Sequence, residues 1–576
     1  MKTRLKKRSF NLSSLREVIY SRLGFLRELY TYIERLLGRE VKEEYIDLGD
    51  FPIPGNLDEA MVIYPYLRDY VESLGRRPRY RVNLEYEMSE EGDIDVIYPV
   101  GKGVFIHVVS GSDIGQYIVI EPPRLNPSIL EKIELSVASL IDEKTLSNGV
   151  DEEEVLIRLF NKAIRRLKLR FPREEERWLL YHFLRDRLGY GFLQSLLQDD
   201  WLEDIGVPGA GKIFVFHKIF GPLETSIEVD EELLDAFLRR IAERHGKVLS
   251  HDNPIIDIHL ADGSRLNVVF GKDISLKGSN FTIRKFSKYP ISIAHLIRWN
   301  TVSPKAAAYL WMLLETGISA FVCGETASGK TTTLNAIVAF IRPDAKIVSI
   351  EETPEVNIFH KNWVREVTRL HTGATVTMFD LVKAALRQRP DYIIIGEIRG
   401  EEGRIAFQAI ETGHPVLSTM HAGNMGQLFQ RLTSYPINVP KTHIDSLNLV
   451  IFQARIERGR RFIRRITSIN EILGFDAEEG RLNYLSSFIY DFDRDRLDFT
   501  GLSFLLEYKV LQARGWGKER LPELYEEMEK RAVILQYLAE KHASYTDVFR
   551  TVAEVNRRGV DAVYRRILRG DKPWSE

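Results

Sequence analysis

The chain has 576 residues, 44% hydrophobic and 28% charged, with 80 basic against 82 acidic residues. This length is enough for about three to five domains, and the composition is that of an ordinary globular protein. A net charge of −2 argues against binding nucleic acid over the whole surface, so no nucleic-acid partner is favoured. The one cysteine, Cys323, excludes internal disulfides and a zinc site of four cysteines.

The first 45 residues are basic and amphipathic. Apolar residues recur at three- and four-residue steps over 12–37, which predicts a helix that packs on its own domain or lies on a membrane or partner. Neither a signal peptide nor a membrane span is expected, since Glu315 and Gly317 interrupt the most apolar stretch. The sequence therefore predicts a cytoplasmic protein, peripherally associated with the cytoplasmic membrane, and the N-terminal helix is one candidate for the membrane contact.

Composition and periodicity change several times along the chain, which indicates a modular α/β protein. The predicted regions are the basic helix (1–45), an N-terminal α/β and helical region (46–170), a second α/β region (171–286), a linker (287–293), a motor domain (294–505) and a helical C-terminal region (506–576).

Residues 324–331 form a complete G-x-x-x-x-G-K-[ST] phosphate-binding loop, between an apolar run (318–323) and a helical pattern (331–340). Its glycines let several N–H groups point into one concavity. Lys330 can reach the β and γ phosphates, and the Thr331 hydroxyl can hold Mg²⁺. The residues predicted to bind ATP are Gly324, Glu325, Thr326, Ala327, Ser328, Gly329, Lys330, Thr331 and Thr332.

Three further strand-like runs alternate with helical patterns, and each ends in a chemically useful residue. The first ends at Glu351-Glu352, the second at Gly396-Glu397 and the third at His421. Alternation of strands and helices predicts a mainly parallel sheet with helices on both faces, and ligands bind such sheets at the carboxyl ends of the strands.

ATP hydrolysis needs one carboxylate near Mg²⁺ and another that activates water. The usual Asp-Glu ending of the metal-side strand reads Gly396-Glu397 here, so we expect Glu397 to support Mg²⁺ or water and Glu351 to be the general base. Adjacent side chains on extended backbone point apart, so Glu352 is either a support or a solvated residue. His421 is expected to sense the γ-phosphate, although an ordinary core or loop histidine would fit too.

These motifs resemble those of the type II/IV secretion ATPase superfamily. In the order of that family, the chain has the phosphate loop 324–331, an acidic box at 350–354, an atypical Walker B motif at 389–399 and a histidine box at 412–421. The Gly-Glu ending of the Walker B motif is typical of this family. The resemblance implies a RecA-like P-loop ATPase domain with a separate α/β N-terminal domain.

Within the superfamily the chain resembles most the archaeal branch of type IV pilus and archaellum assembly ATPases. The similarity covers roughly residues 45 to 560, and the tetracysteine module of many bacterial members is absent. The segments that carry it, beside the phosphate loop, are Ile120–Pro123, Arg431–Thr433, Pro436–Pro440 and Glu471–Ile472.

The resemblance also implies that the N-terminal domain donates arginines to the nucleotide, and Arg265 and Arg284 fit these positions; by chemistry alone they would be surface arginines. It implies a homo-hexameric ring that drives a type IV pilus-like filament through an integral-membrane platform protein. Two alternatives stay open: a DNA-transfer motor of the same superfamily, and a scaffold that binds ATP without turnover.

Overall fold

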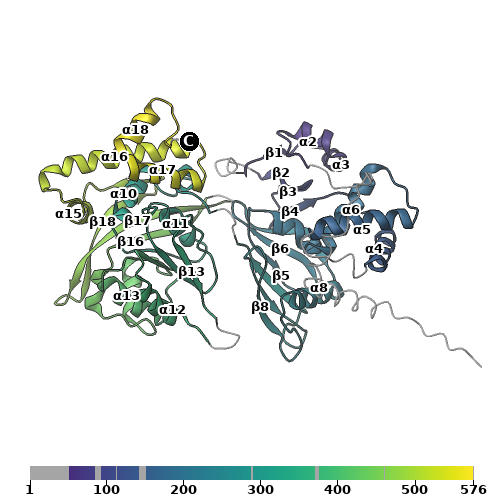
Figure 1. Ribbon diagram of the computed structural model, residues 1–576, viewed down its shortest axis with the longest axis horizontal. Coiled ribbons are helices and arrows are strands. Elements are labelled where there is room, and N and C mark those ends of the chain that lie inside the picture. Colours follow the sequence, from purple (N-terminus) through teal and green to yellow (C-terminus); the bar gives the residue numbers. More distant parts are fainter. Residues whose placement is uncertain are drawn as a thin grey trace, which may run out of the picture. The chain divides into compact units, whose positions relative to one another are not determined.

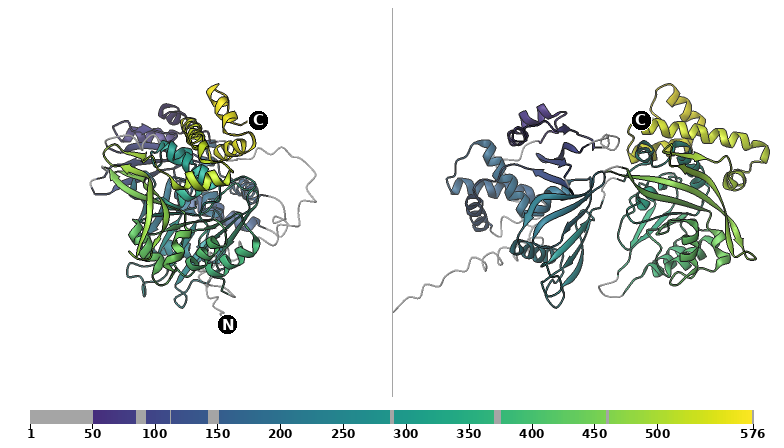
Figure 2. Two further views of the ribbon diagram at one scale, coloured as in Figure 1. Left: turned by 90° about the vertical axis from the view of Figure 1, so that its left-hand side faces the viewer. Right: turned by 180° about the vertical axis from the view of Figure 1, so that it is seen from behind.

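The computed structural model describes residues 51–84, 93–111, 113–141, 151–286, 290–369, 375–458 and 461–574. The chain divides into two compact units, Met1–Lys285 and Phe286–Glu576 (Figures 1 and 2). The predicted N-terminal helix lies outside the described residues, and so do residues 287–289 of the predicted linker. In the part that is described, no helix has the length and apolar character needed to cross a membrane.

The first unit is built on a ten-stranded sheet of order β1-β2-β3-β4-β7-β6-β5-β10-β9-β8. Its strands are β1 (Arg79–Tyr80), β2 (Asp95–Gly101), β3 (Val104–Val109), β4 (Gly115–Ile120), β5 (Leu202–Val207), β6 (Gly211–His217), β7 (Gly221–Val229), β8 (Ile255–His259), β9 (Arg265–Val269) and β10 (Asn280–Arg284).

Strands from 46–170 and from 171–286 therefore belong to a single sheet. The join is the parallel pair of β4 and β7, in which Gly115 lies opposite Leu223. A side chain at position 115 would bring its Cβ to 2.6 Å from a methyl carbon of Leu223, so glycine permits this close approach. Pairing also satisfies backbone groups that would otherwise lie unbonded at two strand edges.

Seven α-helices accompany this sheet in the described part of the first unit. They are α2 (Leu57–Ile63), α3 (Pro65–Ser73), α4 (Pro127–Leu140), α5 (Glu152–Arg166), α6 (Arg173–Arg187), α7 (Gln194–Gln198) and α8 (Glu231–Arg244). Arg185 of α6 is buried and donates hydrogen bonds of 2.7 and 2.8 Å to the two carboxylate oxygens of Glu121, directly after β4. The Ile120–Pro123 segment thus fastens the end of β4 to α6.

The second unit is built on a nine-stranded sheet of order β13-β12-β14-β15-β11-β16-β17-β18-β19. The six strands from β13 to β16 run parallel, and β16 to β19 are paired antiparallel. This confirms the predicted α/β class. The strands are β11 (Ala320–Gly324), β12 (Ile347–Glu351), β13 (Trp363–Val367), β14 (Tyr392–Ile395), β15 (Val416–Met420), β16 (Leu449–Arg458), β17 (Arg461–Asp476), β18 (Arg481–Asp491) and β19 (Arg496–Phe499).

Helices cover both faces of this sheet, as the alternation of strands and helices predicts (Figure 1). Successive strand residues point to opposite faces, so Val322 packs in one core and Phe321 in the other. On the Val322 side lie α9 (Ile293–Arg298), α10 (Pro304–Glu315), α11 (Lys330–Val338), α16 (Leu521–Glu540), α17 (Tyr545–Arg558) and α18 (Val560–Leu568); on the Phe321 side lie α12 (Met378–Ala385), α13 (Glu402–Glu411) and α14 (Met425–Thr433).

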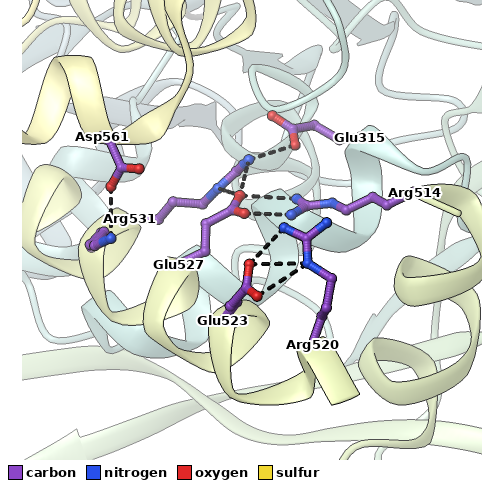
Figure 3. Close-up of polar contacts among 8 residues, drawn as sticks. Glu315, Arg514, Arg520, Glu523, Glu527, Arg531 and Asp561 are labelled. Carbon is purple, nitrogen blue, oxygen red and sulfur yellow. Dashed lines mark hydrogen bonds and ion pairs between the residues drawn. The ribbon is translucent and has the colours of Figure 1, made fainter. Parts of the chain in front are cut away.

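The C-terminal region is helical, as predicted, and shares the core of the parallel sheet. An ionic cluster fastens α16 to α10 (Figure 3). Buried Arg531 donates one 2.8 Å hydrogen bond to Glu315, and it pairs with Glu527 at 2.8 Å. Glu527 also accepts from Arg514 at 2.9 Å, while the Arg531 guanidinium lies 4.5 Å from the centre of the Trp311 ring. Removing one partner would leave a buried charge uncompensated, so this cluster fixes α16 in place.

Candidate nucleotide-binding site

The phosphate loop connects β11 to α11, as its sequence predicts. Gly329 (φ 92°) and Ala327 (φ 61°) are left-handed, which curls the backbone so that N–H groups face one concavity. A side chain on Gly324 would clash with the carbonyl oxygen of Gln453, so this position requires glycine. The ammonium of buried Lys330 donates 2.9 Å to the carbonyl of Glu325 at the rim of the loop.

Glu351 ends β12 and is 1% exposed. Its Oε1 accepts 2.7 Å hydrogen bonds from the backbone N–H groups of Glu355 and Val356. Its Oε2 has no hydrogen-bond partner among the described residues, and lies 3.7 Å from Nε of Arg365. Burial raises the pKa of Glu351 to about 7, against the two backbone hydrogen bonds and Arg365, which lower it. A carboxylate with a pKa near neutrality is suited to act as a general base.

Gly396, which replaces the usual metal-side aspartate, lies beside Glu351. The strands β12 and β14 are paired neighbours, with Ile350 opposite Ile395, so Glu351 and Gly396 meet at the same edge of the sheet. A Cβ at position 396 would lie 3.2 Å from Cγ of Glu351. The missing side chain therefore provides the space that Glu351 occupies.

Glu397 and His421 are in contact, 3.2 Å apart between Oε1 and Nε2. Arg399 donates 2.7 Å to the other carboxylate oxygen of Glu397. Burial lowers the pKa of His421, and the positive charge of Lys330 lowers it further, against the attraction of Glu397. Lys330, Glu397 and His421 thus form one electrostatic group at the carboxyl edge of β11, β14 and β15.

The remaining residues predicted to belong to the site lie partly in the second unit and partly in the first. Glu352 is exposed and lines a cavity of about 260 Å³ with Thr377 and Glu401. Arg265 and Arg284 lie in the first unit as direct cross-strand partners on β9 and β10, and Arg265 donates 3.2 Å to Asp257. Within the loop, Glu325 and Thr326 are exposed, Ser328 is buried, and Thr331 and Thr332 at the start of α11 are half-buried.

Two residues beside the loop were not predicted from the sequence. Gln453 of β16 is buried next to Gly324 and Gly329, and Arg464 of β17 donates from Nε to the carbonyl of Ala327 at 3.1 Å. Both lie more than 120 residues after the loop and belong to no recognisable motif. No local signal could have found them, because their place depends on the pairing of β16 with β11 and β17.

A strand, a glycine loop and a helix in a parallel sheet, with carboxylates at the carboxyl edge, define a P-loop nucleotide-binding protein. Comparison with known proteins gives the family. The family described as "Type II/IV secretion system protein" matches residues 187–469. The chain belongs to this family of secretion ATPases, and membership implies nucleotide binding and ATP hydrolysis.

Two relatives come from Methanocaldococcus jannaschii. Uncharacterized protein MJ0900 is 43% identical over 512 residues, which cover 83% of this chain and 93% of the relative. Uncharacterized protein MJ1287 is 42% identical over 262 residues, 45% of this chain and 96% of the relative. Among solved structures, the VirB11 ATPase from the Brucella suis type IV secretion system is similar at 20% identity and a TM-score of 0.26, over 48% of this chain and 91% of that one.

Proposed function

We propose that this protein is a Mg²⁺-dependent ATPase that powers the assembly or movement of a type IV pilus-like filament. The observation that carries the enzymatic part is Glu351. It is a buried carboxylate with a pKa near 7 and one oxygen without a hydrogen-bond partner in the described chain, at the same sheet edge as the phosphate loop. A residue in such surroundings is a strong candidate for proton transfer.

The roles of the other residues follow from their positions. Lys330 and the loop N–H groups bind the phosphates, and Thr331 with Glu397 would hold Mg²⁺, since hydroxyl and carboxylate oxygens are its preferred ligands. When bound, Mg²⁺ neutralises charge on the phosphate oxygens. Glu351 would take the proton of the attacking water. His421, in contact with Glu397, would respond to the γ-phosphate and pass the change to its neighbours.

The motor part of the proposal is supported by membership of the type II/IV secretion system family. We propose a homo-hexamer of the archaeal branch in which Arg265 and Arg284 reach the nucleotide, and linker 287–293 lets the two units move. An integral-membrane platform protein would receive the movement at the cytoplasmic face of the membrane. An arginine that contacts the phosphates can contribute roughly 10³ to 10⁵ in rate.

Steady-state ATP hydrolysis by the purified full-length chain, with and without Mg²⁺, tests this function. We expect Mg²⁺-dependent turnover that Lys330→Ala abolishes and that Glu351→Gln lowers by about 10² to 10⁴. Glu352→Gln is the matched control, because it removes the same charge from the adjacent exposed position. A folded wild-type chain that binds ATP and never hydrolyses it would leave the scaffold alternative instead. Stimulation of hydrolysis by DNA would favour the DNA-transfer motor.

A further inference from the structure

The predicted catalytic residues all lie on one side of the phosphate loop. In the sheet, β11 has β15 on one side and β16 on the other. Glu351, Glu397 and His421 end or follow β12, β14 and β15, so all three lie on the β15 side. The γ-phosphate has to be near the carboxylate that activates water. We therefore expect the remainder of a nucleotide to extend from the loop to the other side, toward β16 and β17.

On that side, two polar side chains face the loop closely. Gln453 is 3% exposed, and its Oε1 has no hydrogen-bond partner among the described residues. Its Nε2 lies 2.9 Å from the position that a Cβ on Gly329 would take, and Cδ of Arg464 lies 3.0 Å from the same point. Together with the hydrogen bond from Arg464 to Ala327, these contacts place a buried amide and a guanidinium against the outer wall of the loop.

The same face of the β16–β17 hairpin continues with a cation and an aromatic ring. Arg455 is the direct cross-strand partner of Arg464, so both side chains leave the same face. Phe462 is two residues before Arg464, roughly 7 Å along the strand, and also shares this face. The guanidinium of Arg455 lies 4.7 Å from the centre of the Phe462 ring. Arg455 is exposed and Phe462 half-buried, so a ligand can reach both.

We propose that this face, formed by Gln453, Arg455, Phe462 and Arg464, is the nucleoside side of the nucleotide site. Arg464 contacts the phosphate chain, because a guanidinium matches phosphate oxygens with two parallel N–H donors. Arg455 and Phe462 stack on the base, since planar guanidinium and aromatic groups both offer faces to a purine. This inference rests on the proposed function. It adds to the nucleotide site a surface that contacts the base and so determines which nucleotide binds.

Calorimetric binding of ADP and of inorganic tripolyphosphate to the full-length chain separates base from phosphate contacts. Phe462→Ala and Arg455→Ala are expected to weaken ADP binding roughly tenfold each and to leave tripolyphosphate binding unchanged. Arg464→Ala should weaken both ligands, and Arg464→Lys should restore part of the loss. Phe462→Trp, which keeps an aromatic face, should bind ADP as the wild type does.

Arg458→Ala is the matched control. It removes the same charge from the same hairpin, but alternation places Arg458 on the face opposite Arg455, where it pairs with Asp495 at 2.9 Å. Its binding of both ligands should equal that of the wild type. Circular dichroism of every variant checks that it is folded.

The possible failures are distinguishable. If Lys330→Ala abolishes binding while Arg455→Ala, Phe462→Ala and Arg464→Ala leave it unchanged, the nucleoside surface is wrong and the proposed ATPase survives. Equal losses of ADP and tripolyphosphate in Phe462→Ala would overturn the assignment of this ring to the base. A wild-type chain that binds neither ligand would contradict the proposed function itself.

Discussion

Two buried glutamates of the same sheet, Glu351 at the end of β12 and Glu471 in β17, differ in how their oxygens are satisfied. Glu471 is fully buried. It accepts hydrogen bonds from the Tyr309 hydroxyl at 2.6 Å, the Ser487 hydroxyl at 2.5 Å and the backbone N–H of Leu505 at 2.7 Å. Glu351 is equally buried, yet one of its oxygens has no hydrogen-bond partner among the residues described.

The difference indicates a structural role for Glu471 and a chemical role for Glu351. The region around Glu471 joins β17 to α10, to β18 and to the chain leading into the C-terminal helices, and both carboxylate oxygens take part. The region around Glu351 leaves one oxygen without a hydrogen bond, 3.7 Å from Nε of Arg365, at the carboxyl edge of a parallel sheet, where ligands bind. A buried acid whose two oxygens are hydrogen-bonded holds a fold together, whereas one with an oxygen that lacks a hydrogen bond is suited to exchange a proton.

Substitutions of the two glutamates are expected to have opposite effects on turnover and on stability. Glu351→Gln should lower kcat by about 10² to 10⁴ and keep the fold, since it removes a base and preserves the shape. Glu471→Ala should destabilise the second unit by roughly 3 to 5 kcal/mol, because three buried donors lose their acceptor. Hydrolysis rates and urea unfolding of both variants measure this. Loss of stability in Glu351→Gln with normal turnover would reverse the assignment.

The raised pKa of Glu351 should make the stability of the protein depend on pH. The pKa of Glu351 is raised from its ordinary 4.5 to about 7, so between these values the folded protein binds more protons than the unfolded chain. The free energy of unfolding should therefore fall as the pH rises from 4.5 to 7, by on the order of 3 kcal/mol, and level off above. Unfolding of wild type and Glu351→Gln at several pH values isolates this contribution. A wild-type advantage that grows with pH would contradict it.

Gly396→Ala tests the space in which Glu351 lies. The added Cβ would come to 3.2 Å from Cγ of Glu351, so that side chain has to shift. We expect a loss of about 1 to 3 kcal/mol in stability from overpacking, with a parallel fall in turnover. Gly426→Ala, inside α14, is the control and should be neutral or slightly stabilising. Unchanged turnover in Gly396→Ala would mean that Glu351 needs no such space.

Arg399→Ala should have the smallest effect on stability. Its side chain is 64% exposed, and exposed ion pairs contribute about 0 to 1 kcal/mol. Arg399 lowers the pKa of His421, so its removal should raise that pKa, while Glu397 stays in contact. The ring resonances of His421, followed by NMR across pH 5 to 8, report the shift. A fall of the His421 pKa would show that Arg399 acts differently on this group.

The fold class of the second unit was predictable because its signals are local. The loop 324–331 and the strands before and after it are contiguous patterns, and a parallel sheet brings the carboxyl ends of such strands to one edge. The single sheet of the first unit was not predicted, because its join at Gly115 and Leu223 pairs strands about a hundred residues apart in sequence. The predicted contributions of Arg265 and Arg284 stay predictions.

The phosphate loop, the class of sheet and the acidic residues that end or follow its strands could all be predicted from the sequence, since backbone conformation and side-chain type are encoded over a few neighbouring residues. The tertiary structure was needed to show that Glu351 is buried with one oxygen lacking a hydrogen bond, that both oxygens of Glu471 are hydrogen-bonded, and that Gln453 and Arg464 face the loop. These properties depend on which distant strands pair and on what surrounds each polar atom. Pairing between distant strands produces no periodic pattern in the amino-acid sequence, so it could not be predicted.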